Sequence, residues 1–364
     1  MKILHFHTDA RMAARFIAPL MEAEREAGYQ TGLVSSVRRL EKEDVIIPFD
    51  LSLSNLLGLP LALLKIRSHV KRYCPDVVFS HNTKSSLLPL LGAWWVGVPV
   101  RVYFNHGVPY VAYRGMFRCL LRALERWNAA LATHVITVSQ DMVALLQDIS
   151  PQIKPQIIQS GSASGIDLQA FSPGRYSRAD WRTAHGLCDE DLVVVFIGRP
   201  ERRKGFELVL GLWADYFRHH THFKLVLCGS EQDDVLKCLG TLPANVISLG
   251  FVNNVPEVLV CSDLLILPTL HEGLPYAILE AQASDLVVVA NDISGIRCVV
   301  EDGVTGFLVP NNVPSKYIEI IQKIDKDRTA FADIRRRARS NVEKFSRKLF
   351  IPSYLSFLSS LLPK

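Results

Sequence analysis

Short apolar runs alternate with longer amphipathic stretches from one end of the chain to the other. The amphipathic stretches predict helices, such as those at 13–27 and 57–73. The apolar runs predict strands at 2–7, 31–35, 77–80, 100–104, 135–138, 193–197, 224–228, 246–249, 264–267 and 287–290. This alternation is typical of parallel sheets connected by crossover helices, so the predicted fold class is α/β.

A stretch of small residues at 160–167, followed by 171–174, separates the two series of strands. The length of 364 residues suits two domains rather than one core. We therefore predict two Rossmann-like domains, residues 1–170 and 171–347, with parallel sheets facing across a cleft. Ligands of such sheets bind beyond the carboxyl ends of the strands, where we expect the functional residues.

Composition excludes several classes of protein. The net charge of +5 favours anionic partners only weakly, and no basic stretch is interleaved with aromatics, so no nucleic acid is expected. The basic run at 335–339 is interpreted as a solvated helix face rather than a nucleic-acid patch. Seven scattered cysteines suggest structural thiols in a reducing cytoplasm.

The chain shows no targeting or spanning segment. Residues 1–7 run straight into a strand pattern, which is not a signal peptide. The longest uncharged apolar stretch, 87–100, is shorter than the roughly 20 residues that cross a bilayer. A cytoplasmic protein is expected, either soluble or peripheral at the inner face of the membrane.

Two carboxylates, Glu272 and Glu280, follow the buried run at 264–267. Glu272 falls on a loop and Glu280 within a predicted helix that has Pro275 in its first turn. A diphosphate could bind the positive end of this helix through the backbone N–H groups of Leu274, Tyr276 and Ala277. The alternative is an ordinary loop followed by a helix whose glutamate faces solvent.

A second anion-binding pattern follows the run at 193–197. Gly198 permits a tight turn, and Arg199 and Lys204 place two cations on a loop between strand and helix. Such cations can neutralise a diphosphate and stabilise it as a leaving group. Arg202 and Arg203 are cations too, so spacing alone does not rank the four, and a solvated charged loop is the alternative.

Together these segments resemble glycosyltransferase family four, a group of retaining enzymes with the GT-B fold. The matching patterns are Gly-Arg-x-x-x-x-Lys-Gly at 198–205, Glu-Gly-Leu-Pro-x-x-x-x-Glu at 272–280 and Gly-Ile-Asp-x-x-x-Phe-x-Pro at 165–173. Segments 81–84 and 103–109 are similar to the branch that makes bacterial capsule and O-antigen polysaccharides. The fold of this family also implies that residues 348–364 form a helix that crosses back to the first domain.

The resemblance implies roles for individual residues. Arg199 and Lys204 would hold the diphosphate of the donor, Glu280 would accept from the ribose hydroxyls, and Glu272 would contact the transferred sugar. His106 would face the donor, unless it is a core or capping histidine. The implied catalytic residues are His106 and Glu272, and the implied donor-binding residues are Gly198, Arg199, Lys204, Gly229, Val252, Leu274, Pro275, Tyr276, Ala277 and Glu280.

The acceptor side departs from the family pattern. Asn82 and Thr83 stand where relatives have a Thr-Pro pair, and 8–12 lacks the Gly-Gly pair common after the first strand. Arg11 or Arg15 could touch an anionic acceptor or simply begin a solvated helix. The candidate acceptor-binding residues are Thr8, Arg11, Asn82, Thr83 and Lys84.

Two further patterns have alternative interpretations. The acidic triplet 189–191 has the Asp-x-Asp spacing of metal-dependent transferases, but we interpret it as a turn, since cations already fill the role of a metal. No metal or other cofactor is predicted. The helix predicted at 57–73 ends in basic residues, which fits either docking to an anionic membrane or an ordinary packed helix.

The predicted function is transfer of a hexose or N-acetylhexosamine from a nucleotide diphosphate sugar to a lipid-linked oligosaccharide. Among such donors, a UDP-sugar is predicted. The alternatives are a nucleotide-sugar epimerase on the same fold and a catalytically silent nucleotide-sugar-binding scaffold. A third alternative is a dinucleotide dehydrogenase, against which the absence of glycine from residues 8–13 argues.

Overall fold

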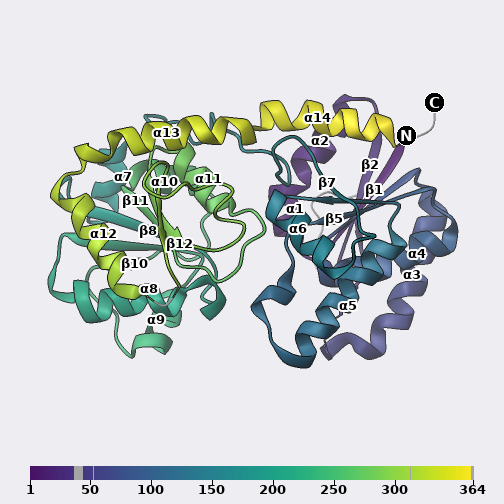
Figure 1. The fold of residues 1–364 in the computed structure, drawn as a ribbon, viewed down its shortest axis with the longest axis horizontal. Coiled ribbons are helices and arrows are strands. Elements are labelled where there is room, and N and C mark those ends of the chain that lie inside the picture. Colours follow the sequence, from purple (N-terminus) through teal and green to yellow (C-terminus); the bar gives the residue numbers. More distant parts are fainter. Residues whose placement is uncertain (37–43, 52, 312, 362–364) are drawn as a thin grey trace. The chain divides into compact units, whose positions relative to one another are not determined.

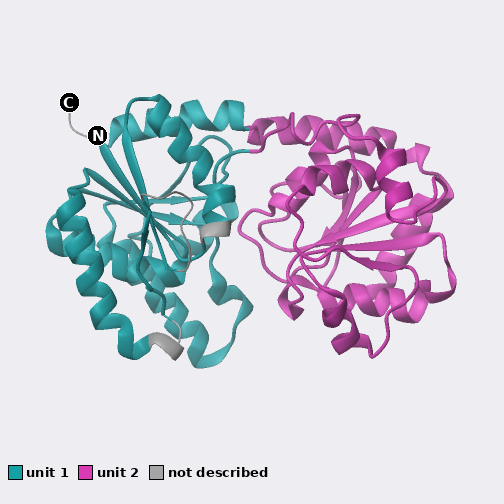
Figure 2. Ribbon diagram, turned by 180° about the vertical axis from the view of Figure 1, so that it is seen from behind, with its two compact units in different colours: residues 1–165, 347–364 teal, residues 166–346 magenta. Residues whose placement is uncertain are grey.

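The computed structural model describes residues 1–36, 44–51, 53–311 and 313–361, except for the side chains of residues 10, 11 and 53–55. The chain divides into two compact units, each built around its own sheet (Figure 1). Unit 1 is Met1–Gly165 with Arg347–Lys364, and unit 2 is Ile166–Ser346 (Figure 2). The division thus falls after Gly165, whereas the sequence pattern placed it after residue 170.

The sheet of unit 1 has seven strands in the order β3-β2-β1-β4-β5-β6-β7, and every neighbouring pair is parallel. Every strand predicted for this half is present. The bounds are β1 Lys2–His7, β2 Gln30–Ser35, β3 Val45–Ile46, β4 Val77–His81, β5 Val100–Asn105, β6 His134–Thr137 and β7 Pro155–Ile157. The strands β3 and β7, both at sheet edges, were not predicted.

Two helix predictions in unit 1 need correction. The continuous helix predicted at 13–27 is wrong: α1 ends at Phe16 and α2 begins at Ala18, with Pro19 in its first turn. Proline lacks the N–H that would continue the helix. The helix predicted from residue 57 begins at Leu59, with Pro60 in its first turn. The bounds are α1 Ala10–Phe16, α2 Ala18–Glu26, η1 Leu53–Gly58, α3 Leu59–Tyr73, α4 Thr83–Val96, η2 Pro109–Ala112, α5 Gly115–Leu131, α6 Gln140–Ile149 and α14 Arg347–Ser360.

The last helix of the chain, α14, belongs to unit 1 and packs on α2. Its Tyr354 is fully buried and donates a hydrogen bond to the carboxylate of Glu24 on α2. The end of the chain is therefore part of the interior of unit 1.

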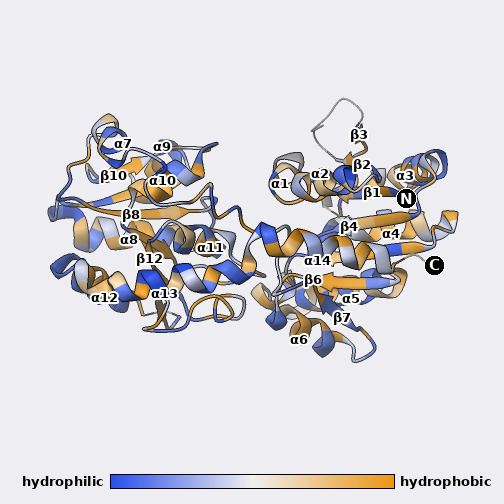
Figure 3. Ribbon diagram, turned by 90° about the horizontal axis from the view of Figure 1, so that it is seen from above, coloured by the Kyte–Doolittle hydropathy of each residue, from blue (hydrophilic) through white to orange (hydrophobic). Residues whose placement is uncertain are grey.

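The sheet of unit 2 has six strands in the order β10-β9-β8-β11-β12-β13, again all parallel. The strands are the most hydrophobic part of each unit, whereas the helices mix both kinds of residue (Figure 3). Buried strands of parallel sheets need this composition because helices cover both faces. The bounds are β8 Leu192–Ile197, β9 Phe223–Cys228, β10 Val246–Ser248, β11 Leu264–Leu267, β12 Val287–Asn291 and β13 Phe307–Val309, of which only β13 was not predicted.

The helices of unit 2 include the basic run at 335–339. There Arg335 and Arg336 pair with Asp285 and Asp333, as expected of a solvated helix face. No helix in the described part of the chain is both long and apolar enough to cross a membrane. The bounds are α7 Arg178–Ala184, η3 Arg202–Lys204, α8 Phe206–Gly211, η4 Leu212–Tyr216, η5 Phe217–His219, α9 Gln232–Leu239, α10 Val255–Cys261, α11 Tyr276–Ala283, α12 Pro314–Lys326, η6 Thr329–Phe331, α13 Ala332–Val342 and η7 Glu343–Phe345.

Candidate active site

Three backbone segments meet at the carboxyl edge of the unit 2 sheet, after β8, β9 and β10. The N–H of Gly198 donates to the backbone carbonyl of Cys228 at 3.0 Å, and the N–H of Gly229 donates to the carbonyl of Gly250 at 2.7 Å. Gly229 has a φ of 98°, and a Cβ there would lie 2.7 Å from the carbonyl oxygen of Gly198. A side chain would be excluded, so glycine is required for this approach. Val252, expected in the base pocket, is half-buried just beyond Gly250.

The loop after β8 is fastened to the loop after β11. The carbonyl of Arg203 accepts a hydrogen bond from the N–H of Leu270 at 2.9 Å. Gly205 has a φ of 80°, and a Cβ there would lie only 2.3 Å from the carbonyl oxygen of Pro268. This contact orients Lys204, which lies between the two fastened residues, toward the second loop.

Lys204 and Glu272 form an ion pair, with 2.6 Å between Nζ and Oε1. Their side chains are 21% and 13% exposed, so the pair is partly shielded from water yet open to a ligand. Arg199 instead pairs with Glu201 at 2.8 Å and is 69% exposed. The structure thus distinguishes cations that spacing could not rank: Lys204 is paired with a candidate catalytic carboxylate and largely shielded, whereas Arg199 is a largely exposed surface group.

The helix α11 follows this loop directly. Pro275 is the residue before the helix, not part of its first turn as predicted, and its carbonyl accepts from Ile278 at 3.0 Å. Leu274 is buried, and Tyr276 and Ala277 are half-buried at the start of the helix. The first N–H groups of a helix have no acceptor within it and attract anions. The start of α11 therefore presents the donors that a diphosphate needs.

Glu280 is buried, with only 4% of its surface exposed. The alternative of a solvent-facing glutamate in the middle of a helix is therefore wrong. A carboxylate is buried at considerable cost in solvation unless polar groups meet it, so a packing role alone does not account for it.

His271 was missed by the sequence reasoning. It is buried beside the Lys204–Glu272 pair, and burial lowers its pKa to about 4. The charge of Glu272 opposes this shift, while those of Arg203 and Lys204 add to it. His271 is therefore neutral at pH 7. A single histidine in a loop pattern carries no signal that would have identified it.

In unit 1, the candidate residues follow β1, β4 and β5, which are neighbours in the sheet. The amide nitrogen of Asn82 lies 2.8 Å from Nε2 of His7, and Thr8 accepts through its carbonyl from Ser36 at 2.6 Å. Asn82 has a φ of 70°, a conformation rarely adopted outside glycine. Burial lowers the pKa of His7 to about 4, so this edge carries a neutral imidazole.

Thr83 lies inside unit 1 rather than on its surface. Its hydroxyl donates to Glu125 at 2.7 Å, and the other carboxylate oxygen of Glu125 accepts from Tyr103 at the same distance. Asn105 donates to Tyr103 at 2.9 Å and completes the network. Burial raises the pKa of Glu125 to about 7, against these hydrogen bonds, which lower it. Lys84 is exposed, and the side chain of Arg11 lies outside the described residues.

His106 lies just past the end of β5 and is half-buried. Its Nε2 lies 2.9 Å from Nδ1 of His81. Burial lowers the pKa of His106 to about 3, with a further contribution from His7. One ring nitrogen of His106 is thus anchored to the core, as in a core histidine, while the ring stays partly exposed, as in a residue that faces a ligand.

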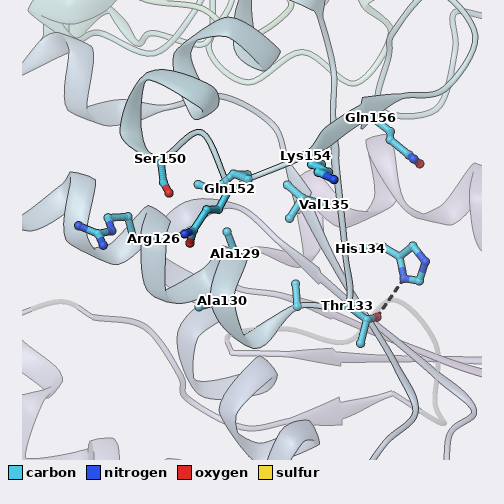
Figure 4. A pocket seen from close by; sticks show the side chains of 12 residues that line it. Arg126, Ala129, Ala130, Thr133, His134, Val135, Ser150, Gln152, Lys154 and Gln156 are labelled. Atoms are coloured by element: carbon cyan, nitrogen blue, oxygen red, sulfur yellow. Dashed lines mark hydrogen bonds between the residues drawn. The ribbon is translucent and has the colours of Figure 1, made fainter.

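A cavity of about 520 Å³ lies at the opposite edge of the unit 1 sheet, where β6 begins (Figure 4). Arg126, Gln152 and Lys154 line it, with His134 held by Thr133 at 3.0 Å. It is formed at the amino ends of strands, where this fold class does not place its chemistry. We therefore assign the candidate site to the carboxyl edges.

The acidic triplet before β8 forms the predicted turn. The carboxylate of Asp191 accepts from the N–H of Cys188 at 2.8 Å and closes the turn. Within the described residues, no three His, Cys, Asp or Glu side chains are grouped so as to hold a metal ion.

Comparison with known families matches both halves of the chain. The family described as "Glycosyl transferases group 1" matches residues 177–345, and "Glycosyltransferase Family 4" matches 13–161. With two Rossmann-like domains, the chain is an α/β glycosyltransferase of the GT-B fold, as predicted. It belongs to glycosyltransferase family four.

Individual relatives agree with this assignment. The chain is 27% identical to the UDP-Gal:alpha-D-GlcNAc-diphosphoundecaprenol alpha-1,3-galactosyltransferase of Escherichia coli, over 73% of this chain and 70% of that protein. It is 24% identical to the capsular polysaccharide biosynthesis glycosyltransferase CapM of Staphylococcus aureus, over 79% and 77%. The crystal structure of Anabaena Alr3699/HepE in complex with UDP-glucose has a TM-score of 0.80 at 19% identity, over 99% of this chain and 100% of that chain.

Proposed function

We propose that this glycosyltransferase moves a hexose or N-acetylhexosamine from a UDP-sugar to a lipid-linked oligosaccharide in bacterial surface-polysaccharide synthesis. The observation that carries the proposal is the partly shielded Lys204–Glu272 pair beside the start of α11. Support for the class of substrates comes from relatives named for UDP-galactose, a diphosphoundecaprenol acceptor and capsular polysaccharide.

In this proposal, the charges of unit 2 bind the donor. Lys204 has three N–H donors and can hold a phosphate oxygen while it still contacts Glu272. Arg199 breaks its ion pair with Glu201 and contributes a second positive charge to the diphosphate, and the start of α11 contributes N–H groups to it. Glu272 contacts the sugar, and buried Glu280 accepts from the ribose hydroxyls. These groups stabilise the charge of the departing diphosphate, so the reaction proceeds without a metal.

The stereochemical course in this proposal is retention. The leaving diphosphate takes the proton of the acceptor hydroxyl on the same face of the sugar, so no side chain has to act as nucleophile. His106 of unit 1 serves as a hydrogen-bonding partner of a sugar hydroxyl rather than as an acid, because its pKa of about 3 keeps it neutral.

A thermal-shift screen against UDP, GDP, dTDP and their sugars, without metal and with a chelator, tests the donor site. A ligand that binds only the folded protein stabilises it by an amount that grows with the logarithm of the ligand concentration over the dissociation constant. We expect a shift with UDP and its sugars that Lys204→Met removes. The control is Lys316→Met, which breaks the exposed pair with Glu319. Equal shifts in both variants would refute the role of Lys204, and a shift only with added metal would refute the metal-free reaction.

Turnover distinguishes the alternatives. With a UDP-sugar and GlcNAc-diphosphoundecaprenol, a transferase lengthens the lipid-linked saccharide. An epimerase would change the UDP-sugar without any acceptor. A silent scaffold would bind UDP-sugar and leave both substrates unchanged.

We also propose that unit 1 docks on an anionic lipid surface, where a lipid-linked acceptor resides. Large apolar side chains are exposed along η1, α3, α4 and α5, and the last three of these helices pack on one another in sequence. Basic side chains lie among them, such as Lys65 and Arg114, and Arg67 stacks on Trp95 at 4.7 Å. Apolar insertion with basic neighbours is typical of interfacial binding. The exposed apolar residues are Leu56, Leu57, Leu61, Leu64, Trp94, Trp95, Met116, Phe117, Leu120 and Trp127.

Sedimentation with vesicles tests this docking. Wild-type protein is expected to bind phosphatidylglycerol vesicles more than phosphatidylcholine vesicles and to lose binding in salt. The double variant Met116→Ser, Leu120→Ser should bind less, while Leu236→Ser on α9 of unit 2 should not. Equal binding by both variants would refute docking through these helices.

A further inference from the structure

Five side chains form a continuous line of hydrogen bonds through unit 1, here called the histidine chain. Tyr354 donates to Glu24, and Glu24 contacts Nε2 of His5 at 3.0 Å. Nδ1 of His5 lies 3.1 Å from Nε2 of His81, and Nδ1 of His81 lies 2.9 Å from Nε2 of His106. The chain thus connects the last helix of the protein to a candidate catalytic residue.

Four of these five side chains are completely buried, and only His106 reaches the surface. The three imidazoles come from β1, β4 and the end of β5, which are adjacent parallel strands. Successive ring centres are 5.4 Å and 5.2 Å apart. A buried polar network is unfavourable unless every member is satisfied, and it then holds one arrangement rigidly.

The hydrogen-bond capacity of each group links the position of its proton to that of its neighbour. Burial favours the acid form of Glu24, but its interactions with His5 and the hydrogen bond from Tyr354 outweigh burial and lower the pKa of Glu24. An ionised carboxylate only accepts, so Nε2 of His5 must carry a proton. When that is the one proton on His5, its Nδ1 accepts, and this requires a proton on Nε2 of His81.

The same rule applies to the next contact. His81 accepts at Nδ1, so His106 must donate from Nε2 and has an unprotonated Nδ1. Burial and the neighbouring histidines lower the pKa of His81 well below its usual value, and that of His106 is about 3. Both rings therefore remain neutral at pH 7, and the direction of the chain is preserved along its length.

We infer that His5 carries a single proton, on the Nε2 that faces Glu24, and that Glu24, acting through His5 and His81, fixes His106 as the tautomer that carries its proton on Nε2 and offers Nδ1 as a hydrogen-bond acceptor. Given the proposed function, that nitrogen accepts from a hydroxyl of a sugar. Glu24, His5 and His81 are then positioning residues: they never touch the substrate, but they set the hydrogen-bonding character of the residue that does. Nothing in the sequence spacing of these residues indicates the connection.

Nitrogen-15 NMR of the full chain with labelled histidines reads the tautomers directly. We expect protons on Nε2 of His5, His81 and His106, assigned by single His→Phe variants. In Glu24→Met the chain loses its fixed acceptor, so His106 should show a mixture of both tautomers. Tyr354→Phe removes the other contact to the same carboxylate and should leave the pattern unchanged.

Kinetics supply the second readout. A mismatched hydrogen bond to the sugar is expected to lower kcat/KM roughly tenfold in Glu24→Met and not in Tyr354→Phe. If Glu24→Met does not fold, His81→Phe tests the same connection, because phenyl fills the space of the ring without either nitrogen. The two connection-breaking variants should resemble each other in tautomer pattern and in kcat/KM.

Two results would overturn the inference. A proton on Nδ1 of His106 in the wild type would mean that His5 carries two protons and that the chain runs in the other direction. An unchanged His106 tautomer in Glu24→Met or His81→Phe would mean that Glu24 does not control it. The NMR test requires no substrate, so failure of UDP-sugars to bind would refute the proposed function and leave this inference standing.

Discussion

Replacing Glu125 by glutamine is expected to abolish a pH-dependent loss of stability in unit 1. Glu125 is completely buried on α5 and accepts hydrogen bonds from Thr83 and Tyr103, each at 2.7 Å. Burial nevertheless raises its pKa from 4.5 to about 7, because those donors only partly replace the lost water. The folded protein therefore retains a proton that the unfolded chain releases between these two values.

The sign follows from proton linkage. Below pH 4.5 both states bind the proton, so the contribution of Glu125 to stability is fully present. As the pH rises to 7, only the unfolded chain releases it, and stability falls; above pH 7 the loss is complete. The difference between 4.5 and about 7 corresponds to roughly 3 kcal/mol, of which about 2.5 kcal/mol is lost between pH 5 and pH 8.

Urea unfolding of wild type and Glu125→Gln at pH 5, 6, 7 and 8 measures this effect. Glutamine has nearly the same shape and cannot ionise, and all other groups titrate alike in both proteins. The difference between them therefore isolates Glu125. Hydrogen exchange of the amides of α5 and β5 in urea follows unit 1 without interference from unit 2.

The change with pH in the stability difference between Glu125→Gln and wild type must have one sign. Glu125→Gln must gain stability relative to wild type as the pH rises from 5 to 8. A difference that stays constant within about 0.5 kcal/mol would show that the carboxyl is already ionised in the folded state. A difference of opposite slope would show that the hydrogen bonds donated to the carboxylate by Thr83, Tyr103 and Asn105 outweigh burial.

The other predictions concern unit 2. Glu280→Gln is expected to weaken UDP binding by roughly 1.5–3 kcal/mol, the range for a hydrogen bond to a charged group, and unchanged affinity in calorimetry would reject its role. Asp263→Ala should lower the free energy of unfolding in urea by about 3–5 kcal/mol, because it leaves buried Arg182 without its carboxylate at 2.7 Å. The control is Asp148→Ala, which removes the exposed ion pair with Arg122 and should cost less than about 1 kcal/mol. Similar losses in both variants would contradict the prediction. Gly205→Ala should weaken UDP binding and lower stability more than Gly174→Ala. Both glycines have a φ near 80°, but only at position 205 would the new Cβ clash, with the carbonyl oxygen of Pro268. Equal losses in both variants would show that backbone strain alone causes them.

The strands could be predicted from the sequence wherever burial was complete. The runs that became β8 and β11 are apolar throughout because helices cover both faces. The missed strands β3, β7 and β13 have only two or three residues and end the two sheets. An edge strand pairs on one side and needs no continuous apolar run, so hydrophobicity alone does not identify it.

The charged residues of the loops after β8 and β11 could be selected as candidates from the sequence, but their contacts could not be predicted. Lys204 and Glu272 were each selected as ligands of the donor, yet they are far apart in sequence, and their ion pair exists because β8 and β11 are neighbours in the sheet. Strand order is decided by packing, which the local pattern does not contain. Glu125 was missed for the same reason: its burial depends on how α5 packs against α4 and β5.

The two units place different chemistry at the same position in the fold. In unit 2, the carboxyl edge of the sheet carries a fixed ion pair and the start of a helix, which suit a diphosphate. In unit 1, burial keeps His7, His81 and His106 neutral, and a carboxylate orders the protons of the last two. Neutral imidazoles suit hydroxyl groups, which a charged site would bind less selectively. If the proposed reaction is correct, unit 2 determines how strongly the nucleotide is bound, and the histidine chain of unit 1 determines how the sugar is oriented.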